Sequence, residues 1–397
     1  MLETPRANRL HIALFGRRNA GKSSLINALT NQDIALVSPI PGTTTDPVYK
    51  AMEILPLGPV VLIDTAGLDD EGELGQLRVQ KTREVLPKAD LALLVVDATT
   101  GITSFDREIA ALCRQHNLPL VGVLNKSDLA DPDLAAARAV LDLPWVKVSS
   151  RTGAGIEELK QAMIEQAPQN WEPETILGDL VKPGDTVVLV VPIDSAAPKG
   201  RLILPQVQVL RDCLDHGVMA YVCREFELEQ TLANLQQPPA LVVTDSQAFG
   251  LVSRLVPENV PLTSFSILYA RYKGDLATLA AGARAISALK PGDRVLIAEA
   301  CTHHRQPDDI GRAKIPRWLN QLAGGELQYT WSSGQGYPDN LEDFKLIVHC
   351  GACMLNRRSM LHRLQQARSR QVPIVNYGVL IAAVHGILER VLKPFGV

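Results

Sequence analysis

Short apolar runs alternate with amphipathic segments along the first 168 residues of the chain. The apolar runs have the length of strands and cover residues 10–16, 60–67, 91–98, 118–126 and 145–150. Helical patterns separate them, for example at residues 23–31 and 105–116. Because continuous apolar strands that alternate with helices form a parallel sheet covered on both faces, this pattern predicts an α/β domain.

The alternation is interrupted at residues 166–185, where Pro, Asn, Gln and Glu replace the apolar pattern and predict a linker. A second βα series follows, with strand-like runs at residues 186–193, 219–225 and 240–246. A third series opens with the apolar run 264–272 and continues with runs at residues 294–301, 344–350 and 372–378. We therefore predict three α/β domains, at residues 1–168, 169–262 and 263–397, of which the last two are smaller and Rossmann-like.

The composition fits a globular protein of several domains, with 46% hydrophobic and 21% charged residues in a chain of 397. The formal net charge of −3 offers no basic surface of the kind that binds nucleic acid. No apolar run approaches the ~18 residues of a membrane-spanning helix, and the first residues lack the apolar segment of a signal peptide. We expect a soluble, cytoplasmic protein with neither a nucleic-acid nor a membrane partner.

The residues that follow the first predicted strand match a phosphate-binding loop. The stretch from Gly16 to Ser23 fits the pattern G-x-x-x-x-G-K-[ST] and lies between a strand and a helix, which is the context that this motif requires. Backbone N–H groups of such a loop surround phosphates at a helix N-terminus. Lys22 is predicted to neutralise the β- and γ-phosphates and the Ser23 hydroxyl to bind Mg²⁺. The predicted contacts in this loop are Gly16, Asn19, Ala20, Gly21, Lys22, Ser23 and Ser24.

Four further segments resemble, in the same order, the motifs of small GTPases. The segment P-G-T-T-T-D resembles the first switch, in which Thr44 matches the threonine that closes on Mg²⁺ and the γ-phosphate. The segment D-T-A-G resembles the second switch, with Asp64 supporting the metal and Gly67 near the reacting phosphate. The resemblance implies that Lys22, Thr44, Asp64 and Gly67 carry out GTP hydrolysis.

The other two segments predict which base is recognised. Asn125, Lys126 and Asp128 match the guanine-reading pattern N-K-x-D, and Ser149–Ser150 resembles the last base-contacting loop. The Asp128 carboxylate can accept two N–H bonds from guanine that adenine does not supply, so GTP is favoured over ATP.

Two residues refine the predicted mechanism. Leu68 follows D-T-A-G where Ras-like proteins carry a water-orienting glutamine, so that mechanism is missing. Asn19 lies inside the phosphate loop, as in bacterial GTPases of the tRNA-modification and ribosome-assembly group, in which this asparagine helps to bind K⁺. The resemblance implies potassium-stimulated hydrolysis, and the alternative is that Asn19 is only a turn residue.

Six cysteines predict a second site. Cys113, Cys213 and Cys223 stand alone in apolar surroundings and are expected to be core residues. The other three lie in the segments C-T-H-H (Cys301, His303, His304) and H-C-G-A-C (His349, Cys350, Cys353), each of which ends a predicted strand of the third series. Because the carboxyl ends of parallel strands share one edge of a sheet, both segments can line one site, beside which Asn376–Gly378 is a further candidate.

Four interpretations of these cysteines remain open from the residues alone. They are an accidental core arrangement, a thioredoxin-like redox pair of Cys350 and Cys353, a zinc site, and an iron–sulfur cluster. The redox pair leaves Cys301 and the histidines without a role. Zinc accepts three cysteines and a histidine, and a cluster on three cysteines leaves one iron open.

A GTPase domain followed by C-x-H and H-C-x-x-C resembles the HydF family, the maturation GTPases of FeFe-hydrogenases, over the whole chain. The resemblance implies a 4Fe–4S cluster on Cys301, Cys350 and Cys353, with His303 and His349 matching the histidines of the motif and His304 as an extra neighbour. It implies a homodimer formed by the middle domain, and a scaffold that holds the di-iron precursor for apo FeFe-hydrogenase with two radical S-adenosylmethionine enzymes as partners. The rival interpretations are an RNA-modification or ribosome-assembly GTPase with structural zinc, and a redox protein with regulatory GTP binding.

Overall fold

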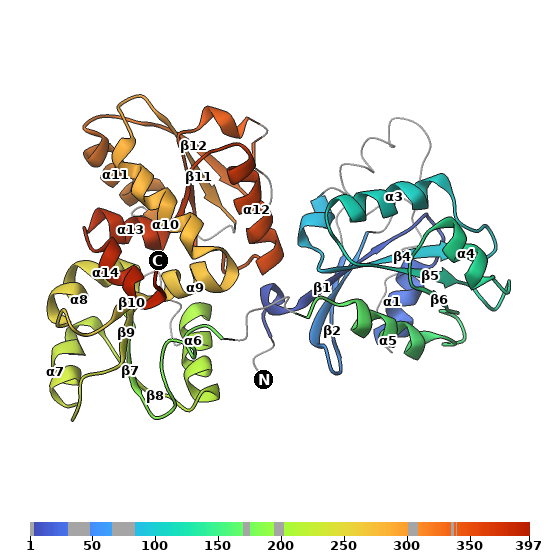
Figure 1. The fold of residues 1–397 in the computed structure, drawn as a ribbon, viewed down its shortest axis with the longest axis horizontal. Coiled ribbons are helices and arrows are strands. Elements are labelled where there is room, and N and C mark those ends of the chain that lie inside the picture. The colour runs from blue at the N-terminus through green and yellow to red at the C-terminus, as the bar shows by residue number, and fades with distance from the viewer. Residues whose placement is uncertain are drawn as a thin grey trace. The chain divides into compact units, whose positions relative to one another are not determined.

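The structure is a computed structural model that describes residues 4–30, 48–65, 84–169, 175–193, 202–300, 309–334, 337–338 and 340–397. The chain divides into two compact units, Met1–Trp171 and Glu172–Val397. Figure 1 labels the helices and strands of each unit. No helix in these described ranges is both long enough and apolar enough to cross a membrane.

The first unit contains a six-stranded sheet in the order β2-β3-β1-β4-β5-β6. Only β2 runs antiparallel, against β3, and the other pairs are parallel. The strands are β1 (Leu10–Phe15), β2 (Val48–Ile54), β3 (Gly58–Asp64), β4 (Leu91–Asp97), β5 (Leu120–Asn125) and β6 (Trp145–Lys147). The described helices are α1 (Lys22–Thr30), α3 (Ser104–Gln115), α4 (Leu134–Val140) and α5 (Ile156–Gln166).

Helices cover both faces of this sheet, as the sequence predicts. Alternate residues of β1 enter two separate cores: Ile12 packs with residues of α1 and α5, whereas Ala13 packs with residues of α3 and α4. Figure 1 shows α3 on one side of the sheet and α5 on the other. The predicted α/β class is confirmed. The hairpin partner β2 was not predicted, because its residues are mostly exposed or half-buried and lack the apolar run of a covered strand.

The second unit contains two four-stranded, fully parallel sheets. The first has the order β10-β9-β7-β8, formed by β7 (Thr186–Val190), β8 (Met219–Cys223), β9 (Leu241–Thr244) and β10 (Leu262–Ser264). The second has the order β12-β11-β13-β14, formed by β11 (Arg294–Glu299), β12 (Gln328–Ser333), β13 (Leu346–His349) and β14 (Ile374–Asn376). The helices are α6 (Leu204–Asp215), α7 (Leu228–Ala233), α8 (Phe249–Leu255), α9 (Phe265–Lys273), α10 (Leu276–Arg284), α11 (Ile315–Ala323), α12 (Arg357–Ser369), α13 (Tyr377–Val384) and α14 (Leu388–Leu392).

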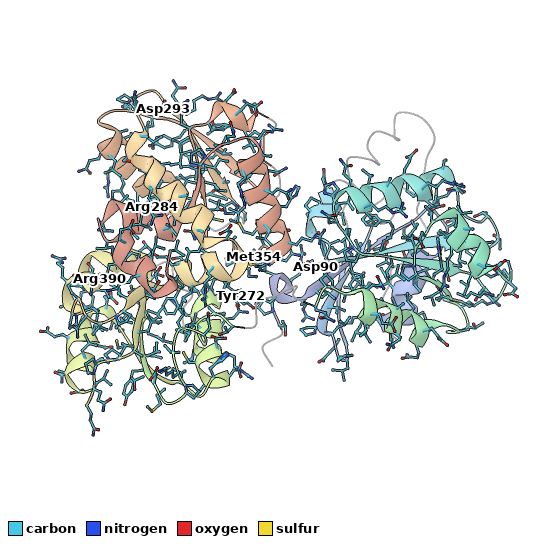
Figure 2. The ribbon with its side chains drawn as sticks, in the orientation of Figure 1. Asp90, Tyr272, Arg284, Asp293, Met354 and Arg390 are labelled. Atoms are coloured by element: carbon cyan, nitrogen blue, oxygen red, sulfur yellow. The ribbon has the colours of Figure 1, made fainter. Side chains whose placement is uncertain are left out.

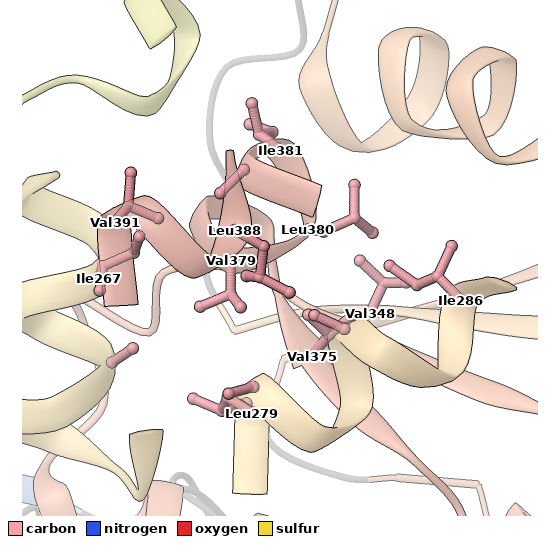
Figure 3. Close-up of a cluster of buried hydrophobic side chains, with 14 of the residues drawn as sticks. Ile267, Leu279, Ile286, Val348, Val375, Val379, Leu380, Ile381, Leu388 and Val391 are labelled. Atoms are coloured by element: carbon pink, nitrogen blue, oxygen red, sulfur yellow. The ribbon is translucent and has the colours of Figure 1, made fainter. Parts of the chain in front are cut away.

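One continuous core joins the two sheets of this unit. It includes Val188 and Val242 of the first sheet and Ile297 and Val348 of the second. Figure 3 shows side chains of α9, α10, α13 and α14 meeting those of the second sheet, among them Ile267. Arg390 of α14, labelled in Figure 2, donates to the carbonyl oxygens of Ser253 and Val256 at the end of α8. The shared core explains why residues 172–397 form a single compact unit.

The structure differs from the sequence-based expectation in the segment 264–272. This segment was expected to open the third series as an apolar strand, but it forms helix α9, whose apolar residues are almost all buried. A continuous apolar run does not distinguish a buried helix from a covered strand. The boundary expected between residues 262 and 263 runs through β10, which pairs with β9 in the first sheet. The three-domain boundaries otherwise stay predictions.

Two other segments also differ. Strand β12 was not predicted, because its residues alternate between exposed and half-buried positions at the edge of the sheet. The second half of the expected linker packs on the protein: Leu177 is fully buried, and its N–H donates to the Asp212 carboxylate of α6. Asp179 forms an ion pair with Arg271 of α9. Residues 175–185 are therefore part of the second unit.

Candidate functional site

The predicted phosphate-binding loop lies between β1 and α1. Gly16 and Gly21 adopt positive φ angles of 150° and 90°. A Cβ atom at Gly16 would collide with the Val95 carbonyl oxygen, and one at Gly21 with the Asn125 side chain, so both positions require glycine. The buried Lys22 ammonium donates to the carbonyl oxygens of Gly16 (2.6 Å) and Arg17 (2.8 Å). The lysine is thereby held at the loop itself, where a phosphate-binding cation is needed.

The predicted magnesium residues are brought together at the end of β3. The Ser23 hydroxyl donates to Asp64 Oδ2 at 2.7 Å. The other oxygen, Asp64 Oδ1, is buried and has no hydrogen-bond partner among the residues that the structure describes. A buried carboxylate oxygen without a partner requires an explanation, and a hydroxyl beside a carboxylate suits the oxygen-ligand preference of Mg²⁺. The donor set therefore fits Mg²⁺. Thr44 and Gly67 lie outside the described residues.

The predicted guanine-binding segments are tied to the phosphate loop. Asn125 Nδ2 donates to the Ala20 carbonyl oxygen at 2.8 Å, and Asn125 Oδ1 accepts from the N–H (3.1 Å) and hydroxyl (2.8 Å) of Ser150. The Ser149 hydroxyl donates to Asp128 Oδ1 at 2.7 Å, which orients the carboxylate predicted to read guanine. Loops that lie far apart in sequence are thus joined into one site.

The structure adds Asp97, which sequence reasoning missed. Lys126 has a positive φ of 64°, and its ammonium lies 2.6 Å from Asp97 Oδ2 at the end of β4. Partial burial raises the pKa of Asp97, but hydrogen bonds from Lys126 and Thr99 outweigh this effect and hold the pKa below its ordinary value. The only signal in the sequence was the carboxylate at the end of the apolar run 91–97.

Asn19 adopts a left-handed conformation, with φ of 59°. Asparagine tolerates this conformation better than most residues, so the backbone alone gives a reason for asparagine here. The role of Asn19 in potassium binding stays a prediction.

The second candidate site lies at the carboxyl ends of β11 and β13. In the order β12-β11-β13-β14, the chain passes from β11 to β12 on one side of the sheet and from β13 to β14 on the other. The pair β11 and β13 is therefore the switch point, where open α/β sheets bind ligands. Ala298 of β11 pairs in register with His349 of β13, and the Cys350 N–H donates to the Ala298 carbonyl oxygen at 3.0 Å. Cys350 is therefore fixed directly at this edge.

The sulfur of Cys350 accepts a backbone hydrogen bond. The Ala300 N–H lies 3.2 Å from Cys350 Sγ, and the side chain is 8% exposed. An N–H group directed at sulfur stabilises a thiolate and is a usual feature of iron–sulfur ligation. Ala352, with φ of 53°, turns the chain between Cys350 and the half-buried Cys353.

The loop after Cys353 is held by α9. The Lys273 ammonium donates to the Leu355 carbonyl oxygen (3.1 Å), and Arg357 Nε donates to the Tyr272 carbonyl oxygen (3.3 Å). Helix α12 begins only at Arg357, with Asn356 accepting from the Ser359 N–H as its N-cap. The support of this loop by Lys273 was not predicted, because Lys273 lies 82 residues before Leu355 in the chain.

Several predicted ligands lie outside the described residues, namely Cys301, His303 and His304. In the described part of the chain, no group of three or more His, Cys, Asp or Glu residues is arranged to hold a metal ion. His349 is fully buried, with Nδ1 2.8 Å from the Cys350 carbonyl oxygen and Nε2 2.8 Å from Arg363 Nη1.

Other titratable groups surround Cys350. Burial, with smaller contributions from Asp309 and the Cys350 thiol group, raises the pKa of Glu299 at the end of β11. Burial also raises the pKa of Tyr377, whose hydroxyl lies 3.5 Å from Glu299 Oε1. Tyr377 belongs to the segment that the sequence marked as a candidate lining. By contrast, Cys113, Cys213 and Cys223 lie in the cores as predicted, and burial raises the pKa of Cys213 to about 11.

Comparison with known proteins assigns the second unit. Residues 277–394 match the model of the hydrogen maturase F tetramerization domain, and residues 176–274 match that of the hydrogen maturase F dimerization domain. Together these two matches cover more than half of the chain. The chain belongs to the hydrogen maturase F family. The predicted family is confirmed, and the chain contains oligomerization domains.

This hydrogen maturase F family member also contains a GTPase domain, because residues 11–126 match a model described as 50S ribosome-binding GTPase. The tRNA modification GTPase MnmE of Nitrosospira multiformis is 40% identical over 169 residues, which are 41% of this chain and 36% of that protein. MnmE of Roseiflexus sp. is 44% identical over 159 residues, 37% of this chain and 34% of the relative. The chain thus spans about a third of the length of these curated relatives.

Among solved structures, the GTPase Era of Aquifex aeolicus is similar over 62% of this chain and 97% of its own, with a TM-score of 0.37 and 22% identity. The G domain of the T. maritima FeoB iron transporter is similar over 40% of this chain and 99% of its own, with a TM-score of 0.32 and 27% identity.

Proposed function

We propose that this chain hydrolyses GTP and carries an iron–sulfur cluster that holds the di-iron precursor of the FeFe-hydrogenase active site until apo-hydrogenase receives it. The observation that carries the proposal is the Ala300 N–H on the Cys350 sulfur, at the switch point of the second sheet in a hydrogen maturase F family member. Cys301 is the next residue in the chain after Ala300, which supports its role as the third ligand. Two radical S-adenosylmethionine enzymes are the proposed suppliers, and the cytoplasm is the proposed location.

Each part of the chain has a distinct task in this proposal. Lys22 holds the phosphates, Ser23 and Asp64 hold Mg²⁺, and Asp128 reads guanine. Cys301, Cys350 and Cys353 would hold the cluster, and the one iron without a cysteine ligand would offer a binding position to the precursor. GTP hydrolysis acts as a timing switch, since a nucleotide can shift the scaffold only through its different affinity for two conformations.

The rival proposal is a GTPase for RNA modification with structural zinc on the cysteines. Its support is the likeness to MnmE, a tRNA modification GTPase, but that likeness covers about two fifths of the chain. Residues 176–394 instead match hydrogen maturase F domains, and the net charge of −3 gives no support for RNA binding. The hydrogenase proposal therefore accounts for more of the chain.

Transfer of the precursor tests the proposal directly. The full chain is isolated anaerobically from cells that contain both maturation enzymes and is then mixed with apo-hydrogenase. We expect hydrogen production to appear after mixing, whereas chain isolated without the two enzymes should give none. Equal activation by the two preparations would refute the carrier function, because the chain would then transfer no cargo made by those enzymes.

Potassium should accelerate GTP hydrolysis by at least about tenfold relative to sodium at equal ionic strength. A cation beside Asn19 would supply transition-state charge that an arginine finger supplies in other GTPases, a contribution of roughly 10³–10⁵ in rate. Asn19→Gly should remove the difference between the salts, because glycine keeps the positive φ and removes only the side chain. Asn117→Gly is the matched control, since Asn117 also has a positive φ, of 48°. Equal rates of the unsubstituted chain in both salts would leave Asn19 as a turn residue.

Strand β8 is the proposed contact in the homodimer. It is the edge strand beside β7, and Met219 (53%), Tyr221 (48%) and Val222 (50%) are exposed on it. An edge strand that exposes apolar side chains is a template for a second strand. Tyr221→Lys should weaken the dimer by at least about tenfold, because two lysines would meet in a symmetric interface.

Light scattering of the eluted protein over a concentration series measures this change. Val140→Lys in α4 replaces a similarly exposed apolar residue (40%) of the other unit and should leave the oligomer intact. An unchanged oligomer in both Tyr221→Lys and Val222→Lys would place the dimer contact elsewhere.

A further inference from the structure

We propose that Arg363 positions the Cys350 loop by holding His349. In this proposal His349 supports the loop and is not a metal ligand. His349 is the last residue of β13 and precedes Cys350, while Arg363 comes from α12. Both side chains are buried, at 0% and 4% exposure. The inference rests on the proposed cluster site, but it concerns the two side chains behind it.

The hydrogen bonds of Arg363 decide the tautomer of His349. Arg363 Nη1 lies 2.8 Å from His349 Nε2, and Arg363 Nη2 donates to the Gly334 carbonyl oxygen at 2.6 Å. A guanidinium group has only N–H donors, so Nε2 must accept with its lone pair. The ring proton therefore lies on Nδ1, which donates to the Cys350 carbonyl oxygen at 2.8 Å.

This arrangement leaves neither ring nitrogen for a metal. A metal binds a histidine through a lone pair, and the lone pair of Nε2 is occupied by Arg363. Cys350 is instead held through its N–H by the Ala298 carbonyl oxygen, through its carbonyl oxygen by His349 and through its sulfur by the Ala300 N–H. His349 and Arg363 thus form a relay from α12 to the loop that presents the thiolate, in the manner of residues that orient metal ligands from behind.

The charge of Arg363 gives a second, independent argument. In the part of the chain that the structure describes, no carboxylate forms an ion pair with Arg363. Its guanidinium carbon lies 5.0 Å from the centre of the Tyr337 ring, which forms an edge-to-face pair with the His349 ring. A buried cation whose described partners are neutral acceptors and an aromatic ring is costly. Anionic thiolates at Cys350 and its partners would offset this cost, so Arg363 also supplies counter-charge to the site.

The test uses the full chain, loaded anaerobically with iron and sulfide. Asparagine can replace the Nδ1–H donor of histidine, and glutamine can replace the Nε2 acceptor. His349→Asn should therefore keep the iron content. Its pulsed EPR spectrum should contain every strongly coupled nitrogen signal that the unsubstituted chain shows. Loss of such a signal in His349→Asn would show that His349 is a ligand and would overturn the inference.

The reduction potential tests the role of Arg363. Arg363→Met removes a buried positive charge and should shift the reduction potential to more negative values. Arg363→Lys keeps the charge, so its reduction potential should stay close to that of the unsubstituted chain. Arg368→Met is the control, because Arg368 is exposed on the same helix. Equal potentials in Arg363→Met and the unsubstituted chain would contradict the proposed electrostatic role.

A metal-free measurement keeps the inference testable if a variant fails to fold. Long-range ¹H–¹⁵N spectra of histidine-labelled, cluster-free chain should show the His349 ring with its proton on Nδ1. The buried His11, whose Nδ1 lies 2.8 Å from the Arg9 carbonyl oxygen, should show the same tautomer, so the His349 signal is assigned by its absence from His349→Asn. Assignment of His349 to the Nε2–H tautomer would overturn the inference. If the unsubstituted chain binds no iron at all, the proposed function fails instead, and the tautomer result remains separate from it.

Discussion

Lys22→Ala is expected to lower GTP hydrolysis on the order of 100-fold or more, while the iron content stays unchanged. The Lys22 ammonium is buried against the carbonyl oxygens of Gly16 and Arg17, so its charge is held at the phosphate-binding loop and is lost in the alanine variant. Loss of one preorganised group that stabilises transition-state charge commonly costs roughly 10²–10³ in rate. Phosphate release at saturating GTP measures the effect.

Lys160→Ala provides the control for this prediction. Lys160 also lies in the first unit, but it forms a surface ion pair with Glu157 and takes no part in the nucleotide site. Its rate should match that of the unsubstituted chain. Normal turnover in Lys22→Ala would refute the catalytic assignment, and loss of iron in that variant would refute the separation of the two sites.

Replacement of the cluster cysteines should give the opposite result. Cys350→Ser and Cys353→Ser each remove one thiolate, and we expect metal affinity to fall by at least about tenfold. Mutation of residues that only hydrogen-bond to metal ligands already lowers metal affinity by about tenfold. Cys301→Ser should behave alike. GTP hydrolysis should stay nearly normal, because its residues all belong to the first unit.

Met354→Ser is a matched control for the cysteine variants. Met354 follows Cys353 in the same loop, but its side chain is 61% exposed and it is no proposed ligand. Iron content should be unaffected. Full iron content in Cys350→Ser would show that the H-C-x-x-C segment is not the cluster site, and lost GTP hydrolysis in a folded cysteine variant would show that the two activities depend on each other.

The positions of the nucleotide-site motifs could be predicted from the sequence, because each described motif is a short local pattern at the end of a strand. The contacts that bind these motifs together could not. Asn125 reaches Ala20 and Asp97 reaches Lys126 only after the sheet has brought separate strand ends to one edge. Such partners cannot be inferred from the spacing of residues along the chain.

The cysteine site was predicted less completely. Its position followed from two strands that end in cysteine segments, and the strand order β12-β11-β13-β14 places β11 and β13 side by side. Arg363 and Lys273 could not be predicted, because they reach the loop from α12 and α9. Helix α9 itself was expected to be a strand, since tertiary burial on all sides removed the helical periodicity from its sequence.

Anaerobic iron and sulfide analysis, combined with EPR of the reduced full chain, tests the central claim that a GTPase and an iron–sulfur scaffold share this chain. The account predicts about four irons and four sulfides per chain, and an EPR signal typical of a reduced 4Fe–4S cluster. Stoichiometric zinc without sulfide, and no EPR signal after reduction, would contradict it and favour the structural-zinc GTPase.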